Sequence, residues 1–586
     1  MESSSNDSSD EVYSPGVSGE SETSSDSIDE LSDMNLLDNN EPIEEAGWRL
    51  VSDIFADTRP EPPPAFSDPH AGVNDRLDKK QFSSPGAAFR YFFDDEVIYT
   101  MCNWINKRAT VYFEANPDKS KVHGLTWHPV TPDELYVFLG LIIVMGVVKL
   151  PDMHMYWSHN VIFGGPEIFS HEVMSRNRFF SILKFLRFAS PDLVDKNNPH
   201  TRIEPYLDLL RDRCQTLIRP SRHIAIDEAL VLWKGRLGFR QVSKTKRAHF
   251  GVKVFVLCPS GERWDGYSWN YALYYDKSNF KIDDPNASQL TVSEDIVVYL
   301  MKDLLDQGRH IITDNWYTSS RLSDYLLTRD TMLTGVVRSG RGPPTIIQKE
   351  KLEKNQAVFA RKNNTLVVKY QDKIEVTVLT TKYNAGMVEK TKTYFGNKTV
   401  FFNKPLHIDK YNKKMGSVDL ADQLLEPYVM QRKSLAWFKK LGIHFMFRTL
   451  LNAFVFYRNE CLFSGDFLDF IMAVSTEWLR ENSRGANEML TQAEMKSMKK
   501  PMKLKNEMEV VHEWVRHEKR GKQKRCRVCF SKEKKRKDTT NYCPGCPGEP
   551  GLCSVDHFKE WHTGSTVADD PRTHTSGVPT KKKCRV

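Results

Sequence analysis

The sequence lacks a long apolar run, and its first residues lack positive charge. Its most apolar stretch, residues 137–150, contains glycine and is shorter than the roughly 20 residues that a helix needs to cross a bilayer. The first 48 residues contain fourteen acidic side chains and neither lysine nor arginine, whereas a secretory signal begins with basic residues. These absences exclude a membrane-spanning helix and a signal peptide, so we expect a soluble intracellular protein.

Cysteine is sparse along most of the chain, which argues against a disulfide-bonded fold. Four of the ten cysteines are scattered, but five lie between Cys526 and Cys553. Two Cys-x-x-Cys pairs and Cys553 precede two histidines, and thiolates and imidazoles at such spacing hold tetrahedral Zn²⁺. We therefore predict a zinc-binding domain with the ligands Cys526, Cys529, Cys543, Cys546, Cys553, His557 and His562.

Charge is divided unevenly along the 586 residues. The whole chain has a formal net charge of +7, but without the acidic start, residues 49–586 carry 83 basic and 62 acidic side chains, or 83 − 62 = +21. An excess of this size commonly indicates a polyanionic partner, and nucleic acid is the obvious one, although many basic proteins bind none.

The pattern of apolar residues changes twice along the chain. The serine-rich and acidic first part lacks apolar periodicity and is predicted to be disordered. Residues 87–220 have helical spacing, with a helix start at TPDE (131–134). From His223 the runs HIAIDEALVLW, GVKVFVLC and YSWNYALYYD indicate strands, and a helix, the strand RHIITD, another helix and the strand TMLTGVVR follow. Helical pattern resumes after a turn-rich hairpin region.

Three aspartates stand where regular elements of the predicted α/β core begin or end. Asp227 ends IAID, Asp314 ends IITD, and Asp419 lies in GSVDLAD with Asp422 three residues later on one helix face. An early strand, a central strand and a later helix are how ribonuclease H-like nucleases present their acids. Such carboxylates can bind two Mg²⁺ or Mn²⁺ ions for phosphoryl transfer. Taken singly, each aspartate also fits a turn former or a helix cap.

Five sequence blocks, in order, resemble the signature blocks of the piggyBac transposases. They are DEALVLWKGRLGFRQ, KTKRAHFGVK, TDNWYTS, GVVRSGR and KKMGSVDLADQ, and the resemblance extends over roughly residues 87–475 and 522–563. It implies that Asp227, Asp314 and Asp419 are catalytic and hold Mg²⁺ or Mn²⁺, with Asp422 as a supporting acid.

The resemblance also implies a reaction and an assembly. Members of the family nick transposon ends, pass through a hairpin on the excised element and join 3′-hydroxyls to TTAA sites. It further implies a homodimer on double-stranded DNA and a nuclear protein. Residues within or near the blocks that are candidate DNA contacts are Lys234, Arg236, Lys246, Arg247, Asn315, Arg338, Arg341, Trp437, Lys439 and Lys440. The bland alternatives are surface charge and, for Trp437, a core position.

In the same family the cysteine-rich domain is a cross-brace that holds two zinc ions, and two ions need eight ligands. This chain offers seven. If Cys526, Cys529, Cys553 and His557 form one site, then the site of Cys543, Cys546 and His562 lacks a ligand, which Asp556, His574 or Cys584 could supply. Binding of a chromatin peptide by this domain remains an alternative to binding of transposon ends.

We therefore predict a multidomain α/β protein with a ribonuclease H-like core, an inserted β-rich domain, a flanking helical dimerisation and DNA-binding domain, and a cross-brace zinc domain. The proposed function is cut-and-paste transposition, and the alternative is a domesticated DNA- or chromatin-binding protein without transposition activity. The predicted segments are a disordered region at 1–80, helical domain at 81–222 and 428–483, catalytic core at 223–340 and 410–427, inserted domain at 341–409, basic linker at 484–521, zinc domain at 522–564 and basic tail at 565–586.

Overall fold

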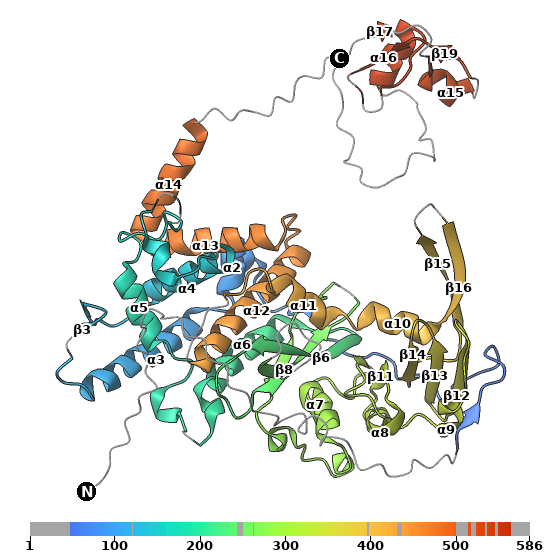
Figure 1. Cartoon of the computed structure of the whole chain (residues 1–586), viewed down its shortest axis with the longest axis horizontal. Coiled ribbons are helices and arrows are strands. Elements are labelled where there is room, and N and C mark those ends of the chain that lie inside the picture. Colours follow the sequence, from blue (N-terminus) through green and yellow to red (C-terminus); the bar gives the residue numbers. More distant parts are fainter. Residues whose placement is uncertain are drawn as a thin grey trace, which may run out of the picture. The chain divides into compact units, whose positions relative to one another are not determined.

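The computed structural model describes residues 47–563, apart from 120, 161, 163, 196, 243–249, 262, 395–397, 431–435, 500–513, 517–522, 534–535, 545 and 547–548. The chain divides into two compact units, residues 1–490 and 491–586, and Figure 1 shows the course of both. Within the described ranges, no helix is both long and apolar enough to cross a membrane.

Helices from two distant parts of the sequence pack together in the first unit. Side-chain caps begin several of them, because Ser84, Asp94 and Thr131 each accept a backbone N–H of the first turn. The buried Trp478 stacks on Phe89, with ring centroids 4.7 Å apart. The helices are α2 (Pro85–Arg90), α3 (Asp95–Glu114), α4 (Pro132–Val147), α5 (Arg176–Phe185), α6 (Glu204–Leu217), α12 (Trp437–Glu460) and α13 (Phe467–Asn482).

A mixed sheet forms the centre of the first unit. Its strands are β6 (His223–Leu232), β8 (Phe250–Pro259), β9 (Asn270–Leu273), β10 (His310–Thr313) and β11 (Met332–Val336), in the order β9-β8-β6-β10-β11. β6 and β8 are antiparallel, whereas β10 is parallel to both β6 and β11. Every residue of β10 is buried, which is typical of a central parallel strand. The connecting helices are α7 (Val292–Met301) and α8 (Ser320–Thr328).

The β-rich region after the core extends this sheet. β12 (Ala357–Lys362), β13 (Thr365–Gln371) and β14 (Glu375–Thr380) form a meander, and β14 pairs antiparallel with β11. A second small core, which includes Phe359, Leu366 and Ile408, packs on these strands. β15 (Met387–Tyr394) and β16 (Lys398–Pro405) form a separate two-stranded sheet, followed by α10 (Leu406–Lys414) and α11 (Ser417–Leu425). The region predicted as an inserted domain is thus hydrogen-bonded to the core strands.

The prediction of disorder through residue 80 differs from the structure between residues 47 and 80. β1 (Arg49–Leu50) pairs with β12, and Asp57 and Asp68 are buried. Asp68 forms ion pairs with Arg219 and with the fully buried Arg309. Low apolar content suggested disorder, but buried ion pairs with distant residues hold this segment in place. We call residues 47–80 the N-terminal strap.

The predicted basic linker also differs in part, because α14 (Arg484–Lys499) is helical. The small second unit, residues 491–586, has a core of cysteines, Val528 and Leu552. Its elements are β17 (Val515–Arg516), β18 (Lys524–Arg525), α15 (Arg527–Glu533), β19 (Asp538–Thr539), β20 (Asn541–Tyr542) and α16 (Val555–Thr563). Two short strand pairs of the first unit lie outside the main sheet: β2 (Gly72–Val73) with β5 (Ile218–Arg219), and β3 (Lys121–Val122) with β4 (Leu125–Thr126). The short strand β7 (Gln241–Val242) pairs with β8 at the edge of the main sheet.

Candidate active site and metal centre

The parallel pairing of β6 and β10 sets two carboxylates side by side. The last paired residues are Ile226 and Thr313, so Asp227 and Asp314 each follow directly. β6 continues through Asp227, which pairs with Val256 of β8, whereas β10 ends and the chain turns away. The position of both acids therefore follows from the register of one ladder.

A third carboxylate joins them. Ligand oxygens of Asp227, Glu228 and Asp314 all lie within 4.8 Å of one another. The hydroxyl of Tyr317 donates to Glu228 at 3.3 Å, and the Nζ atom of Lys253 lies 3.9 Å from the same carboxylate. Sequence reasoning missed Glu228, because neighbouring residues of a strand point to opposite faces. In the sequence, its one signal is that it directly follows Asp227. In the structure, it lies just past the point where β10 stops pairing with β6.

Asp314 is fixed by its own turn. Its carboxylate accepts the backbone N–H of Trp316 at 2.9 Å, and its carbonyl accepts the Thr318 hydroxyl at 2.7 Å. Burial raises the pKa of Asp314 above its usual value, and the charge of Glu228 raises it further, although the Trp316 N–H and the cations Arg338 and Lys253 oppose this. Three carboxylates gathered at one point offer hard oxygen donors, which suit Mg²⁺ or Mn²⁺.

The predicted third and fourth acids lie on α11, which contacts β6 and β8. Asp419 is exposed in the first turn of this helix. Burial raises the pKa of Tyr411, and the charges of Asp314, Asp227 and Asp419 raise it further. Among the described residues, Asp419 is not part of the close group of Asp227, Glu228 and Asp314. Asp422 instead accepts a hydrogen bond from Arg448, whose side chain is buried.

Two arginines predicted to contact DNA have different environments. Arg338 is exposed, and its guanidinium donates two hydrogen bonds to Asn315 Oδ1, at 3.2 and 2.9 Å. Asn315 directly follows Asp314 in the sequence, and Arg338 lies just after the end of β11, the strand that pairs with β10. Arg341 donates to the Trp316 carbonyl and to Ser293 Oγ at 2.6 Å. Arg341 thus ties the turn after Asp314 to the first residues of α7.

The residues on and near α12 that were predicted to contact DNA also differ in their environments. Lys234 is exposed, and the pKa of the half-buried Lys440 is lowered by burial and by Lys234. Lys439 is buried, and its Nζ atom donates to the carbonyls of Leu183 and Lys184 at 3.0 Å each, so it ends α5. Trp437 packs edge-on against Phe239, with centroids 5.2 Å apart. Arg236 is exposed, whereas Lys246 and Arg247 lie outside the described residues.

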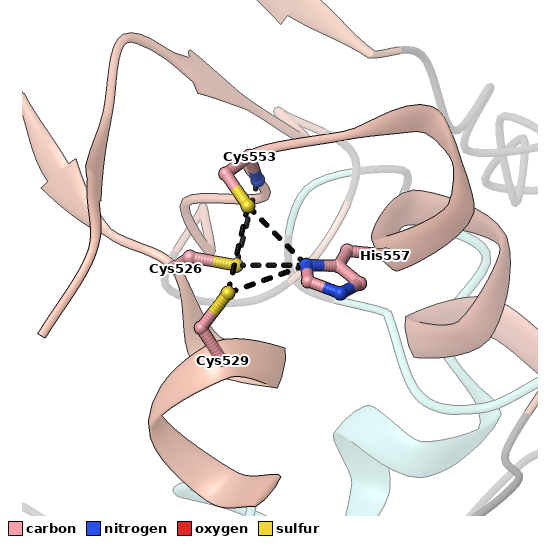
Figure 2. A group of neighbouring side chains, drawn as sticks. All are labelled: Cys526, Cys529, Cys553 and His557. Carbon is pink, nitrogen blue, oxygen red and sulfur yellow. Dashed lines mark hydrogen bonds between the residues drawn. The ribbon is translucent and has the colours of Figure 1, made fainter. Parts of the chain in front are cut away.

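The second unit brings four predicted zinc ligands to one point. Figure 2 shows the sulfur atoms of Cys526, Cys529 and Cys553 around the Nδ1 atom of His557. The three S···N distances are 3.5, 3.5 and 3.3 Å, and the sulfurs of Cys529 and Cys553 are 3.5 Å apart. Tetrahedral Zn²⁺ with bonds of about 2.3 Å to sulfur and about 2.0 Å to nitrogen requires an S···N separation of about 3.5 Å and an S···S separation of about 3.8 Å. The four residues therefore fit a structural zinc ion.

A second group has three ligands among the described residues. Cys543 and Cys546 place their sulfurs 3.5 and 3.2 Å from the Nε2 atom of His562. The Nδ1 atom of His562 lies 2.6 Å from the Phe558 carbonyl, which orients the ring and leaves Nε2 for a metal. Asp556 is exposed and is outside this group, while His574 and Cys584 lie beyond the described residues.

Comparison with known proteins relates both units to one family. Residues 84–454 match the family model described as Transposase IS4, and residues 507–563 match that of a DDE_Tnp_1-like zinc finger. Human PiggyBac transposable element-derived protein 3 is 25% identical over 503 residues, covering 81% of this chain and 76% of that protein. Human PiggyBac transposable element-derived protein 2 is 22% identical over 480 residues, covering 79% and 75%. In fold the chain is similar to a piggyBac transposase, solved by cryo-EM as a synaptic complex with hairpin DNA, with a TM-score of 0.58, 23% identity, and coverage of 72% of this chain and 84% of that one.

Proposed function

Because the chain belongs to the piggyBac-derived family of transposases, we propose that it is a metal-dependent DNA transposase that excises and integrates an element at TTAA sites. The observation that carries the proposal is the convergence of Asp227, Glu228 and Asp314 at the end of the β6–β10 ladder. Family membership indicates the reaction class, and this cluster supplies the carboxylates that would hold the divalent cation needed for that reaction.

The strand arrangement supports a ribonuclease H-like core. β9, β8 and β6 lie in this order, each antiparallel to the next, and β10 and β11 run parallel to β6. In this order β6, the first strand that carries an acid, lies next to β10, the central strand. Asp419 follows on α11, a helix that contacts β6. We infer that Asp227, Asp314 and Asp419 are the catalytic acids, with Glu228 as a further carboxylate of the same site.

The residues around the acids have separable roles. A divalent cation bound there would activate the attacking water or 3′-hydroxyl and stabilise the leaving oxygen. Arg338, held by Asn315, is placed to contact a phosphate of the bound strand. The turn at Trp316 and Thr318 holds the Asp314 carboxylate at a fixed angle. Asp422 is proposed to act through Arg448, which it anchors to α11.

The partners and location are also proposals. The comparison structure is a complex with hairpin DNA, and the excess of 21 positive charges over residues 49–586, from 83 − 62, favours a DNA partner here. We propose that the chain acts as a homodimer in the nucleus and passes through hairpin ends. Two zinc ions in the second unit would hold its short strands together. The sequence KRGKQKRCR, which includes the first ligand, adds positive charge that suits DNA ends.

A second function is favoured by the names of the curated relatives, which are human proteins derived from transposable elements. In that case the chain binds DNA or chromatin but no longer moves an element. The two functions make different predictions for strand cleavage and the same prediction for DNA binding.

An excision assay tests the proposal. A donor plasmid would carry the terminal repeats that flank the coding sequence, and excision would be measured with Mg²⁺ by the repaired empty site. We expect excision by the wild type, none by Asp314→Ala, and near wild-type excision by Asp324→Ala, which removes an exposed carboxylate from α8. A wild type that binds the repeats without excising them would support the second function. Normal excision by Asp314→Ala would overturn the proposed mechanism.

A further inference from the structure

Lys253 is the only charged residue of β8. The rest of the strand is uncharged, and every position after Lys253 is buried. An ammonium among buried neighbours loses hydration, so it requires a compensating contact. Lys253 pairs with Leu230 of β6, and Phe255 pairs with Glu228. Because paired residues and alternate residues of a strand share a face, Lys253 and Glu228 lie on the same face of the sheet.

The ammonium of Lys253 contacts an acid and an indole ring. Its Nζ atom lies 3.9 Å from Glu228 Oε1 and 4.3 Å from the centroid of the Trp316 ring. Trp316 stacks on Phe255, with centroids 5.5 Å apart and an interplanar angle of 11°. The face of an indole ring and a carboxylate both attract a cation. Because the backbone N–H of Trp316 also holds the Asp314 carboxylate, these contacts place the ammonium at the acid cluster.

The contact between Lys253 and Glu228 is an ion pair without a hydrogen bond. Their separation of 3.9 Å exceeds the roughly 3.2 Å limit of an N–H···O bond. In the part of the chain that the structure describes, no oxygen accepts a hydrogen bond from the Lys253 ammonium. An ammonium has three N–H donors. Lys253 can therefore donate to an oxygen from outside the protein while it stays near Glu228.

Solvent reaches both charged groups. The side chain of Lys253 is 18% exposed and that of Glu228 is 20% exposed. Tyr317, whose hydroxyl donates to the same carboxylate, is fully buried. Glu228 thus has one neutral partner in the interior and one charged partner at the accessible side. A divalent cation or a phosphate that enters from solvent meets the acid and the ammonium together.

Lys253 and a divalent cation have a common partner in Glu228. Ligand oxygens of Asp227, Glu228 and Asp314 lie within 4.8 Å of one another, so one cation can contact all three. Two unit charges about 4 Å apart near a protein surface repel by an energy that corresponds to at least about 10-fold in a binding constant. The ammonium therefore weakens binding of a divalent cation at this corner of the site. A phosphate oxygen that accepts from the ammonium offsets that repulsion.

We propose that Lys253 is a further residue of the active site: it competes with the divalent cation for Glu228 in the absence of DNA and donates to the phosphate being cleaved when DNA is bound. The site then binds its cation weakly until DNA arrives, and each of the two strengthens the binding of the other, because such coupling is reciprocal. The inference rests on the proposed function, since the phosphate belongs to a bound DNA strand.

Mn²⁺ binding without DNA is the first test. The full-length, zinc-loaded protein is titrated, and free Mn²⁺ is measured by electron paramagnetic resonance. Lys253→Met removes the charge and should bind Mn²⁺ about 10-fold more tightly than the wild type, whereas Lys253→Arg should match the wild type. Lys302→Gln, which removes an exposed charge at the end of α7, should also match it.

A gain in metal affinity cannot result from misfolding, and Lys253→Gln is the second neutral variant if Lys253→Met does not fold. Unchanged or weaker Mn²⁺ binding by a folded neutral variant would overturn the inference. So would an arginine variant that binds Mn²⁺ as tightly as the neutral variants do.

The same titration with a duplex that carries the terminal repeat tests the phosphate contact. DNA should raise the Mn²⁺ affinity of the wild type, and the gain should be about 10-fold smaller for Lys253→Met. This readout needs binding alone, so it also applies to a protein that binds DNA without cleaving it. If the wild type cleaves, Lys253→Met at saturating Mn²⁺ should cleave about 100-fold more slowly, with Lys253→Arg between the two.

The outcomes separate this inference from the proposed function. An equal DNA-dependent gain for the wild type and Lys253→Met, or equal cleavage by both, would overturn the role of Lys253 and leave the proposed function intact. A wild type that does not bind the duplex would overturn both.

Discussion

The carboxylate of Asp57 accepts two hydrogen bonds, at 2.7 and 2.5 Å, from the guanidinium of Arg361, which lies 304 residues later. Both side chains are buried. The pair connects the N-terminal strap to β12. The same carboxylate also accepts the Ala385 N–H at 2.7 Å, so one acid joins the strap to two parts of the inserted region.

Replacing Asp57 should therefore destabilise the first unit. Asp57→Ala leaves a buried, uncompensated guanidinium, for which we expect a loss of about 3–5 kcal/mol in the free energy of unfolding. Urea unfolding measures the change, and Asp53→Ala, at an exposed position of the same strap, is the control. Equal losses for the two variants would show that the ion pair does not hold the strap.

Replacing Asp314 should stabilise the metal-free protein at neutral pH. Burial raises the pKa of Asp314, and a carboxyl with a higher pKa in the folded chain loses its stabilising contribution as the pH rises through that value. Asp314→Asn should raise the melting temperature at pH 7 by about 1–3 °C and give no gain below pH 3.8. Mn²⁺ should stabilise the wild type but not this variant. A lower melting temperature for Asp314→Asn than for the exposed control Asp75→Asn at pH 7 would contradict the assignment.

Replacing Asp419 should affect metal binding and not stability, whereas replacing Asp422 should affect stability and not metal binding. Asp419→Asn removes an exposed acid, so we expect loss of Mn²⁺-induced stabilisation with little change in unfolding free energy. Asp422→Asn weakens the partner of the buried Arg448 and should cost about 1–3 kcal/mol while keeping the response to Mn²⁺. Thermal melts with and without Mn²⁺, with Gln423→Ala as control, separate the two. Identical behaviour of both acids would reject the division of roles.

The two cysteine groups should hold about one zinc ion each. Metal analysis of the purified chain should give about two zinc ions, and Cys526→Ser and Cys543→Ser should each remove about one. Cys461→Ser, an exposed cysteine of the first unit, should remove none. A wild type without zinc would reject the zinc domain, and unchanged zinc in Cys543→Ser would reject the three-ligand group.

Replacing Lys439 should lower stability without changing DNA affinity, and replacing Lys234 should do the reverse. Lys439→Met removes hydrogen bonds to the last carbonyls of α5 and should lower the free energy of unfolding by about 1–2 kcal/mol without changing the salt slope of DNA binding. Lys234→Gln, at an exposed position, should reduce that slope by about 1 and leave unfolding unchanged. A change of slope for Lys439→Met alone would reverse the two roles.

The sequence predicted the site best where reactive side chains stand at the end of an apolar strand pattern or at the spacing of metal ligands. Asp227 and Asp314 were found because apolar runs end at each of them, and the structure confirms that they are adjacent. Spacing in a short domain predicted zinc binding, and the cross-brace implied by the family resemblance suggested the group of Cys526, Cys529, Cys553 and His557, which the structure brings together. In both cases neighbours in sequence or in one ladder determine the arrangement.

Features that depend on distant partners were missed. The N-terminal strap is polar, and its order depends on Arg361 and Arg309, which no local pattern connects to it. Lys439 resembles an exposed cation in sequence, but the ends of α5 and α12 meet there in the fold. Glu228 was passed over because strand alternation places it on the face away from Asp227, and only the end of β10 beside it brings the carboxylates together.

The ladder between β6 and β10 has a consequence for how this site can change over evolution. Backbone hydrogen bonds, rather than the identity of the flanking side chains, determine where Asp227 and Asp314 lie. Exchanging one apolar residue of β10 for another leaves that alignment intact, whereas adding or deleting a single residue rotates Asp314 to the opposite face of the sheet. The alignment of the two carboxylates therefore tolerates substitution in β10 but not a change in its length, so deletion of one residue from β10 would separate Asp314 from Asp227.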